Sequence, residues 1–524
     1  MRGRPGLAGL AAGLLVAAHS ANAAPPPLER ASIAEIDAAM ADGRLTAEQL
    51  VRFYLDRIAR LDRGGPGLHA VISLNPEALL QARALDAERR SGHVRGPLHG
   101  VPILLKDNIE TADRTPTTAG SLALAANVTG HDAALAARLR AAGAVILGKA
   151  NLTEWANFRS SHATSGWTPV GGLVRNPYAL DRSACGSSSG SAVAVAAGLA
   201  AAAVGSETDG SVTCPSSMEG VTGLKPSLGL IARTRIVPIS HSQDTAGPIA
   251  HTAADAALLA AAMAGSDPAD PPSQAPGAAT AAAALAQVRP ADLRGLRLGV
   301  LRFTPDSYVG IDALYAQALD RLRAAGAVLV EVKLPDEPRL GTDETLVLET
   351  EMKADMAAYL AGAAPAVQAK TLADLIAFNR ATSAETRLFG QDLFEASQAT
   401  KGLQDPAYQA ARAESLRLTG AEGIDRLLVG QRLDALVSPT TGPTWKVDLV
   451  YGDAGPASVA TFPAVAGYPH VTTPMGLVRG LPVGLSFIGP KWSDARVLAL
   501  AEAWEAMTPP LPAPSFPATV DPLP

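Results

Sequence analysis

The sequence predicts an α/β fold in which helices cover a sheet of buried strands. Short apolar runs alternate with amphipathic segments, as in the predicted strand Val101–Leu105, the helix Ala133–Ala142 and the strand Ala144–Leu147. This alternation is typical of a parallel-type sheet with covering helices. The chain has 524 residues, of which only 4% are aromatic, so we expect a large core built from small aliphatic side chains.

Three amphipathic helices are predicted before the first buried strand. Apolar residues recur at helical spacing in Ser32–Met40 and Thr46–Leu61, and Thr46 is a suitable N-cap. A third helix is expected over Asn75–Arg90, where Gly92 follows its end. We expect these helices to pack on the outside of the core.

The middle of the chain contains two less regular stretches. The small apolar run Ala192–Val204 fits a buried helix. Residues 265–292 are rich in Pro, Ala, Asp and Ser, and we interpret them as a linker-like surface insertion within the domain.

The second half is expected to continue the alternation of strands and helices. A strand–helix–strand unit is predicted at Leu296–Arg302, Ile311–Ala325 and Val328–Val332, which by pattern alone could be a separate domain. A mostly helical region follows, and then two strands and a closing helix, at Leu346–Glu422, Leu433–Val437, Val483–Phe487 and Asp494–Met507.

The first 23 residues have the pattern of a secretory signal peptide. Arg2 and Arg4 provide a basic start, Leu7–Ala18 is apolar, and Ala21–Ala23 has the small-residue pattern of a cleavage site. The alternative is a membrane anchor, but the apolar stretch is too short to span a bilayer comfortably. We therefore expect a mature protein of residues 24–524 that is periplasmic or secreted.

The charge balance argues against a nucleic acid or an anionic membrane as a partner. The chain has 44 basic and 50 acidic residues, and loss of Arg2 and Arg4 with the signal leaves 42 basic residues against 50. An acidic surface repels phosphate backbones and anionic headgroups. No nucleic acid or membrane partner is expected, and a monomer is slightly favoured over an oligomer.

Two serines and one lysine form a candidate set for acyl transfer. Ser187 and Ser211 stand in glycine-rich loops, and Lys106 ends an apolar strand. A lysine amine titrates near pH ~10.4, so it can act as a base at neutral pH only if it is desolvated, as in a strand buried on both faces. A second serine can pass protons between that amine and a nucleophilic serine.

Each of these features also has an ordinary explanation. A GSSSGS segment is more often a turn or linker, a lone lysine in an apolar run often extends its amine to solvent, and GLKP at Gly223–Pro226 is a turn by default. The occurrence of these features together, in a fixed order, favours catalysis.

Six ordered segments resemble the amidase signature family of serine amidohydrolases. They are GPLHGVPILLKDNI, GKANLTEWA, RNPY, CGSSSGSAVAVAAG, ETDGSVTCPSSMEGVTGLKPSLGLI and SQDTAGPIA. The resemblance runs from about residue 30 to about residue 505 and is weakest between about 265 and 430. It implies a single large domain with a central mixed sheet covered by helices on both faces, and it places the strand–helix–strand unit in that sheet.

The resemblance also implies a role for each site residue. Lys106 would be the general base and acid, Ser187 the bridging serine on a cis peptide bond, and Ser211 the nucleophile. The N–H groups of Thr208, Asp209, Gly210 and Ser211 would form the oxyanion hole. The sequence departs from the family's usual residues at three positions, Cys185, Ser189 and His251, and we expect the last to alter a structural ion pair.

Within the family, the chain is most similar to bacterial peptide amidases, on segments such as TEWANFR, SGW and LADLIAFN. The implied reaction is hydrolysis of a peptide's C-terminal amide to an acid and ammonia. Three alternatives remain open: an amidase for aryl, aliphatic or fatty acyl amides, the amidotransferase component that amidates charged tRNA, and an inactive binding protein. The signal peptide argues against the second, and retention of all three catalytic residues against the third.

Other residues that could take part in chemistry are ambiguous in the sequence. No histidine pair has metal-ligand spacing, so no metal or cofactor is expected. Asp107 is interpreted as structural because adjacent strand residues face opposite sides. Trp155, Phe158 and Trp167 could line a pocket or the core. Cys185 and Cys214 could form a disulfide or remain two buried thiols.

Overall fold

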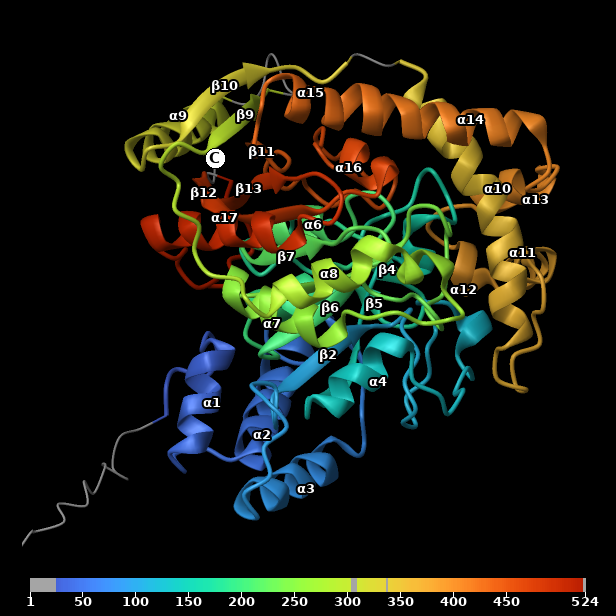
Figure 1. The fold of residues 1–524 in the computed structure, drawn as a ribbon. Coiled ribbons are helices and arrows are strands. Elements are labelled where there is room, and N and C mark those ends of the chain that lie inside the picture. The colour runs from blue at the N-terminus through green and yellow to red at the C-terminus, as the bar shows by residue number, and fades with distance from the viewer. Residues whose placement is uncertain (1–24, 303–308, 336–337, 522–524) are drawn as a thin grey trace, which may run out of the picture.

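A mixed eleven-stranded sheet forms the centre of the protein (Figure 1). The structure is a computed structural model that describes residues 25–302, 309–335 and 338–521, so the predicted signal segment lies outside it. The strand order is β1-β3-β2-β6-β8-β7-β12-β13-β11-β9-β10. The strands are β1 (Val71–Leu74), β2 (Pro102–Lys106), β3 (Val145–Ala150), β6 (Ala202–Glu207), β7 (Thr222–Lys225), β8 (Thr245–Ala250), β9 (Arg297–Leu301), β10 (Val328–Val332), β11 (Ala435–Pro439), β12 (His470–Val478) and β13 (Leu481–Ile488).

Parallel and antiparallel pairs alternate in blocks across this sheet. β2 is parallel to β3 and β6, and β9 is parallel to β10 and β11. The strands β8, β7, β12 and β13 between these blocks pair antiparallel with their neighbours. The predicted mixed sheet is therefore confirmed, and β9 and β10 belong to it because β9 pairs with β11. A separate hairpin is formed by β4 (Trp167–Thr168) and β5 (Gly172–Leu173).

Helices cover the sheet in layers. The helices α4 (Ala134–Ala141), α7 (Ala253–Met263), α8 (Pro276–Leu285) and α17 (Asp494–Met507) pack on one another, and α7 and α17 contact the sheet. The short helices α5 (Ser189–Ala196) and α6 (Thr213–Met218) contact each other and central strands. The helix α9 (Val309–Ala324) packs near β9–β12 at one side of the molecule.

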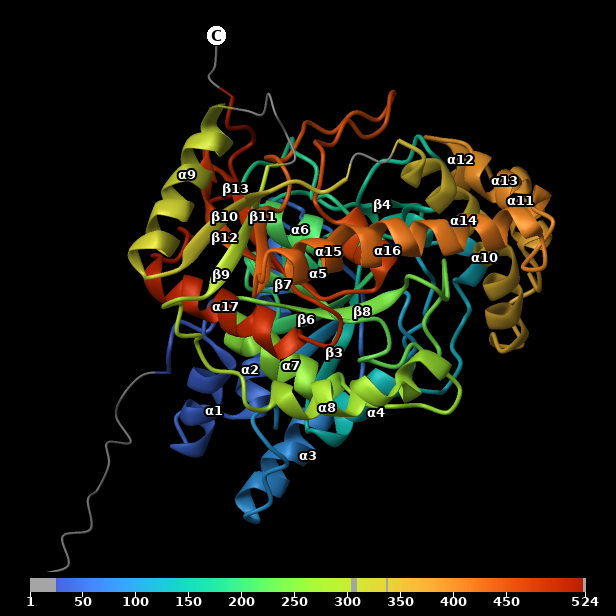
Figure 2. The ribbon, with the colours of Figure 1, turned by 45° about the horizontal axis from the view of Figure 1, so that its top comes forward.

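Two further groups of helices lie mainly toward the bottom and toward the right of both views (Figures 1 and 2). The N-terminal group is α1 (Ile33–Ala41), α2 (Ala47–Arg57) and α3 (Ala78–Arg90). The predicted helical region becomes α10 (Leu340–Ala361), α11 (Leu372–Ala381), α12 (Ser383–Thr386), α13 (Asp392–Ala399) and α14 (Pro406–Leu416), followed by α15 (Asp425–Gly430) and α16 (Thr461–Ala466). In Figure 1 most of this second group is at the right, opposite α9.

Local capping confirms the predicted start of α2. The Thr46 hydroxyl accepts a hydrogen bond from the N–H of Gln49, and the Gln49 side chain accepts one from the N–H of Thr46. This reciprocal pair satisfies two N–H groups that the first turn of a helix leaves free.

The prediction of one buried helix over Ala192–Val204 is wrong. α5 ends at Ala196, Gly198 turns the chain with φ +64°, and Ala202 begins the central strand β6. Glycine adopts this left-handed conformation without the steric cost of a side chain. Because every residue of the run is buried, its hydrophobic pattern carries no period that separates a helix from a strand.

The prediction of a linker-like insertion at 265–292 is also wrong for its central part. α8 begins with Pro276 in its first turn, where a missing N–H costs nothing. Ala278, Ala281 and Leu285 are buried, and α8 packs on α7 and α17. None of the described helices has the length and apolar character needed to cross a membrane.

Candidate active site

Lys106 ends β2 inside the protein, and its amine is held by three oxygen atoms. Lys106 Nζ lies 2.7 Å from Ser187 Oγ, 2.9 Å from Ser206 Oγ and 3.0 Å from the carbonyl oxygen of Ser206. Its side chain is fully buried. Ser206 was not among the predicted site residues, and its only signal in the sequence is its place directly before the ETDGS loop.

Burial lowers the pKa of Lys106 to about 7, because desolvation disfavours the charged amine. The nearby carboxylates of Asp244 and Glu207 act in the opposite direction. A substantial fraction of Lys106 is therefore neutral at physiological pH, as a lysine base requires.

Asp107 does not compete for Lys106. Its carboxylate accepts hydrogen bonds from the N–H and hydroxyl of Thr118 and lies 3.9 Å from the amine of the buried Lys149. This pairing agrees with the prediction that Asp107 is structural, because its carboxylate is engaged away from the Lys106 amine.

Ser187 occupies the loop before α5 and follows a cis peptide bond with Gly186. The side chain is fully buried, and a Cβ at Gly186 would lie 2.2 Å from the hydroxyl of Thr153, so this loop packs closely on the segment after β3. Ser188 also donates its N–H to the carbonyl oxygen of Ser211 at 3.1 Å. The two serine loops are therefore in direct contact.

Ser211 lies between β6 and α6 with 7% of its surface exposed. Its hydroxyl forms no hydrogen bond with the described part of the chain, including the hydroxyl of Ser187. Lys106 is thus hydrogen-bonded to Ser187, but Ser187 is not hydrogen-bonded to Ser211 through its side chain. Catalytic hydrogen bonds are often long without a substrate and tighten in the complex.

The backbone around Ser211 has the form of an anion site. The N–H groups of the four consecutive residues Thr208–Ser211 have no hydrogen-bond partner among the residues that the structure describes. Gly210 has φ +77°, which only glycine adopts readily. Unpaired N–H groups in such a loop can stabilise the oxygen of a tetrahedral intermediate.

Glu207 shapes this loop, although nothing in the sequence singled it out. Its Oε2 accepts the N–H of Val212 at 2.7 Å and the N–H of Thr213 at 2.9 Å. These N–H groups directly follow Ser211 and begin α6. The buried carboxylate thus closes the loop and leaves the preceding N–H groups free.

Two further residues hold the side chains of the same loop. Thr461 donates its hydroxyl to Asp209 Oδ2 at 2.7 Å, and Thr208 donates its hydroxyl to Asp244 Oδ1 at 2.7 Å. Burial raises the pKa of Asp209 and of Asp244 to about 6 each. Asp244 therefore braces the loop through Thr208.

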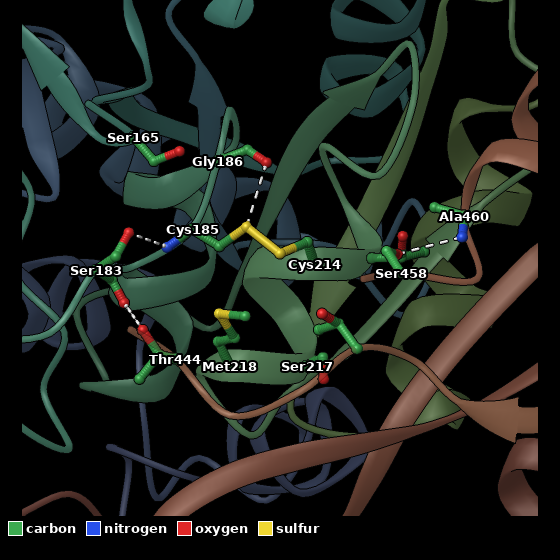
Figure 3. The surroundings of a disulfide bond; sticks show 12 residues. Ser165, Ser183, Cys185, Gly186, Cys214, Ser217, Met218, Thr444, Ser458 and Ala460 are labelled. Carbon is green, nitrogen blue, oxygen red and sulfur yellow. Dashed lines mark hydrogen bonds between the residues drawn. A yellow bond between two sulfur atoms is a disulfide. The ribbon is translucent and has the colours of Figure 1, made fainter. Parts of the chain in front are cut away.

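A disulfide joins Cys185 to Cys214 (Figure 3). Cys185 stands two residues before Ser187, and Cys214 three residues after Ser211. The two Cα atoms are 6.1 Å apart. The structure thus selects the disulfide over two free thiols, and the crosslink ties together the loops that carry both serines.

Removing this crosslink is expected to destabilise the fold. The two cysteines are 29 residues apart in sequence, so replacing both by alanine should lower the free energy of unfolding by about 2–4 kcal/mol, measured by denaturant unfolding. Thiol titration of the unfolded, unreduced protein should find no free thiol. Two free thiols would contradict the crosslink.

The three aromatic residues for which the sequence allowed either a pocket or the core lie in the core. Trp155 and Phe158 belong to an apolar cluster with Phe394, and Trp167 packs edge-on against Phe389 with ring centroids 5.2 Å apart.

The ring of His99 contacts the backbone at Leu85, which gives this residue a structural role. At His251, burial lowers the pKa to about 4.

One group among the described residues has side chains that could hold a metal ion. His241, Glu351 and Asp355 place ligand atoms within 4.8 Å of one another. However, His241 Nδ1 lies 3.0 Å from Asp355 and its Nε2 lies 3.4 Å from Glu351. A protonated imidazole between two carboxylates accounts for this arrangement with no ion.

Residues 49–498 match the family model described as Amidase. The chain belongs to the amidase family. It is 37% identical over 492 residues to a probable amidase of Arabidopsis thaliana, covering 92% of this chain and 90% of the relative. It is also 34% identical to a glutamyl-tRNA(Gln) amidotransferase component of Symbiobacterium thermophilum, covering 91% of this chain and 96% of the relative.

Among solved structures, the chain is similar to the native peptide amidase from Stenotrophomonas maltophilia. The TM-score is 0.89 and the identity 50%, over 94% of this chain and 99% of that one. A structure of the peptide amidase in complex with the competitive inhibitor chymostatin is equally similar, with a TM-score of 0.89. The chain is thus an amide-hydrolysing enzyme of the amidase signature fold.

Proposed function

We propose that this enzyme hydrolyses the C-terminal amide of peptides with a Ser–Ser–Lys triad. The observation that carries the proposal is the fully buried Lys106 amine, 2.7 Å from the Ser187 hydroxyl in a site where burial lowers its pKa to about 7. The triad roles are assigned to Lys106, Ser187 and Ser211.

In the first half-reaction, neutral Lys106 accepts the proton of Ser187 while Ser187 accepts the proton of Ser211. Ser211 Oγ forms a bond to the amide carbonyl carbon, and the carbonyl oxygen becomes an oxyanion held by the N–H groups of the Thr208–Ser211 loop. The proton returns from Lys106 through Ser187 to the amide nitrogen. The C–N bond then breaks, releasing ammonia and leaving an acyl-enzyme on Ser211.

Water completes the second half-reaction by the same route. It gives a proton through Ser187 to Lys106 and forms a bond to the acyl carbon. The Ser211 oxygen leaves with the returned proton, and the peptide acid is released. Side chains and backbone N–H groups of this chain thus account for each proton transfer and for the oxyanion.

The choice of a peptide amide rests on the likeness to the peptide amidase, which is 50% identical. We expect a C-terminally amidated dipeptide to have a kcat/KM about 10- to 100-fold above an anilide, a short aliphatic amide or a fatty acyl amide, the range that a few pocket contacts supply. Ammonia release measures the dipeptide and the aliphatic and fatty acyl amides, and aniline release measures the anilide. Faster hydrolysis of the anilide, the aliphatic amide or the fatty acyl amide would contradict a peptide amide as the substrate. It would not contradict the Ser–Ser–Lys triad.

Export is part of the proposal because residues 1–23 have the pattern of a signal peptide. We expect the protein purified from the periplasm or the medium to begin at Ala24, determined by N-terminal sequencing. Recovery of the uncleaved chain in the cell interior would contradict it.

A further inference from the structure

Three carboxylates form a stripe on α10, in the region where the family resemblance is weakest. Glu344, Glu351 and Asp355 follow one another at intervals of seven and four residues. These intervals place side chains on one face of a helix. All three contact the loop Ser240–Asp244, which leads into β8.

The stripe holds four consecutive residues of that loop. Glu351 Oε2 accepts the N–H of Ser242 at 3.0 Å and the hydroxyls of Ser240 and Ser242. Asp355 accepts the N–H of His241 at 2.7 Å. Glu344 accepts the side-chain amide of Gln243 at 2.8 Å. We call these contacts the α10 clamp.

The opposite side of the same loop forms hydrogen bonds with Thr208, whose N–H is one of the four unpaired N–H groups of Thr208–Ser211. Asp244 Oδ1 accepts the Thr208 hydroxyl at 2.7 Å, while its Oδ2 accepts the N–H groups of Ile239 and Ser240. Gln243 also donates to the carbonyl oxygen of Thr208 at 3.4 Å. The clamp and the oxyanion loop are therefore joined through five consecutive residues.

His241 reduces the electrostatic cost of this arrangement. Its ring lies between Asp355 and Glu351, and hydrogen bonding to Asp355 raises the pKa of His241. The other charged and titratable groups around it are Tyr408, which donates to Glu351 at 2.6 Å, Arg412, whose Nε lies 3.8 Å from Glu351, and Arg233, which donates to the His241 carbonyl oxygen and pairs with Asp270. A protonated His241 thus helps to neutralise two carboxylates that would otherwise repel.

We propose that Glu351 and His241 are positioning residues that fix the oxyanion hole through the loop Ser240–Asp244. The proposal rests on the function proposed above, because it assigns the free N–H groups of Thr208–Ser211 to the oxyanion. Glu351 and His241 do not touch the reacting atoms. Glu351 reaches Thr208 through hydrogen bonds to Ser240, from Ser240 to Asp244 and from Thr208 to Asp244, and His241 supports Glu351 by its charge. Their effect therefore falls on the transition state and not on substrate binding.

The test compares Glu351→Gln and His241→Gln with the matched control Glu349→Gln. Glu349 is on the same helix, and within the described part of the chain it forms no hydrogen bond with the loop Ser240–Asp244. For Glu351→Gln and His241→Gln we expect kcat to fall about 10- to 100-fold with KM within about twofold of wild type, as displacement of catalytic groups does. The inhibition constant of a peptide aldehyde, which forms an oxyanion on Ser211, should rise by a similar factor.

The pH profile separates positioning from a general structural effect. His241 has a raised folded pKa, so its clamp is intact when protonated and weakens as pH rises through that pKa. In wild type this loss of kcat opposes the rise expected as the Lys106 amine becomes neutral at pH about 7, and His241→Gln should keep the rise and lack the loss. His241 is 40% exposed, so this variant keeps the test available if Glu351→Gln fails to fold.

Three results would contradict this role of the α10 clamp. They are a wild-type kcat and aldehyde affinity in both Glu351→Gln and His241→Gln, an equal loss of kcat in Glu349→Gln, and a rise in KM with unchanged kcat in the two clamp variants. All rates are taken relative to wild type on the amide that wild type hydrolyses fastest. If that amide is not a peptide amide, the substrate proposal fails while the ratios between variants still decide the clamp.

Discussion

Ser211→Ala is expected to lower kcat on an amidated peptide by about 10⁴-fold or more, because the acyl-enzyme cannot form. The fold should be unaffected, since the Ser211 hydroxyl makes no hydrogen bond with the described residues. Ammonia release at saturating substrate measures the loss, and thermal unfolding checks the fold.

Ser216→Ala provides the matched control for this variant. Ser216 is a buried serine of α6 whose hydroxyl has no partner in the described part of the chain. We expect near-wild-type kcat from it. Substantial activity in Ser211→Ala, or an equal loss in Ser216→Ala, would mean that Ser211 is not the nucleophile.

Lys106→Met is expected to reduce kcat by about 10³-fold or more at pH 7, because the proton relay acts as a unit. The variant should stay folded, since methionine fills the space of a buried lysine without its desolvation cost. The measurement is ammonia release across pH ~5–9, the range that brackets the lowered lysine pKa, with thermal unfolding as the control.

The pH dependence gives this prediction a second, independent readout. The base must be neutral, and its pKa is lowered to about 7, so wild-type kcat should rise as pH increases through about 7. The residual activity of Lys106→Met should not show that step. A near-wild-type rate in Lys106→Met, or a flat wild-type profile from neutral to acid pH, would contradict a lysine base.

Local features of the fold were predicted well from the sequence. The cap at Thr46 and the buried strand that leads to Lys106 are both visible as short-range patterns. The fold itself, with β9 and β10 joined to one mixed sheet, followed from the family resemblance, because pattern alone allowed a separate domain.

The failures have physical causes. Ala192–Val204 is buried throughout, so neither a helical nor a strand period is visible, and only Gly198 marked the turn. In 265–292, α8 consists mainly of alanine, and its buried side is created by α7 and α17. A composition rich in Pro, Ala and Ser does not reveal such tertiary burial.

The site shows the same division between local pattern and tertiary contact. Lys106 and Ser187 could be paired from the motifs, and the structure places them in contact. Glu207, Thr461 and the α10 carboxylates could not be predicted, because their roles depend on which backbone groups they meet. Thr461 is 252 residues from Asp209, and Glu351 is 111 residues from Ser240.

The most direct test of the central claim is to label the active enzyme with a fluorophosphonate, which forms a stable bond with an activated serine. The mature protein should lose ammonia release in step with uptake of one label per chain, and peptide mass spectrometry should place that label on Ser211. Inactivation with the label on Ser187 or any other residue would contradict the assignment of Ser211 as the nucleophile.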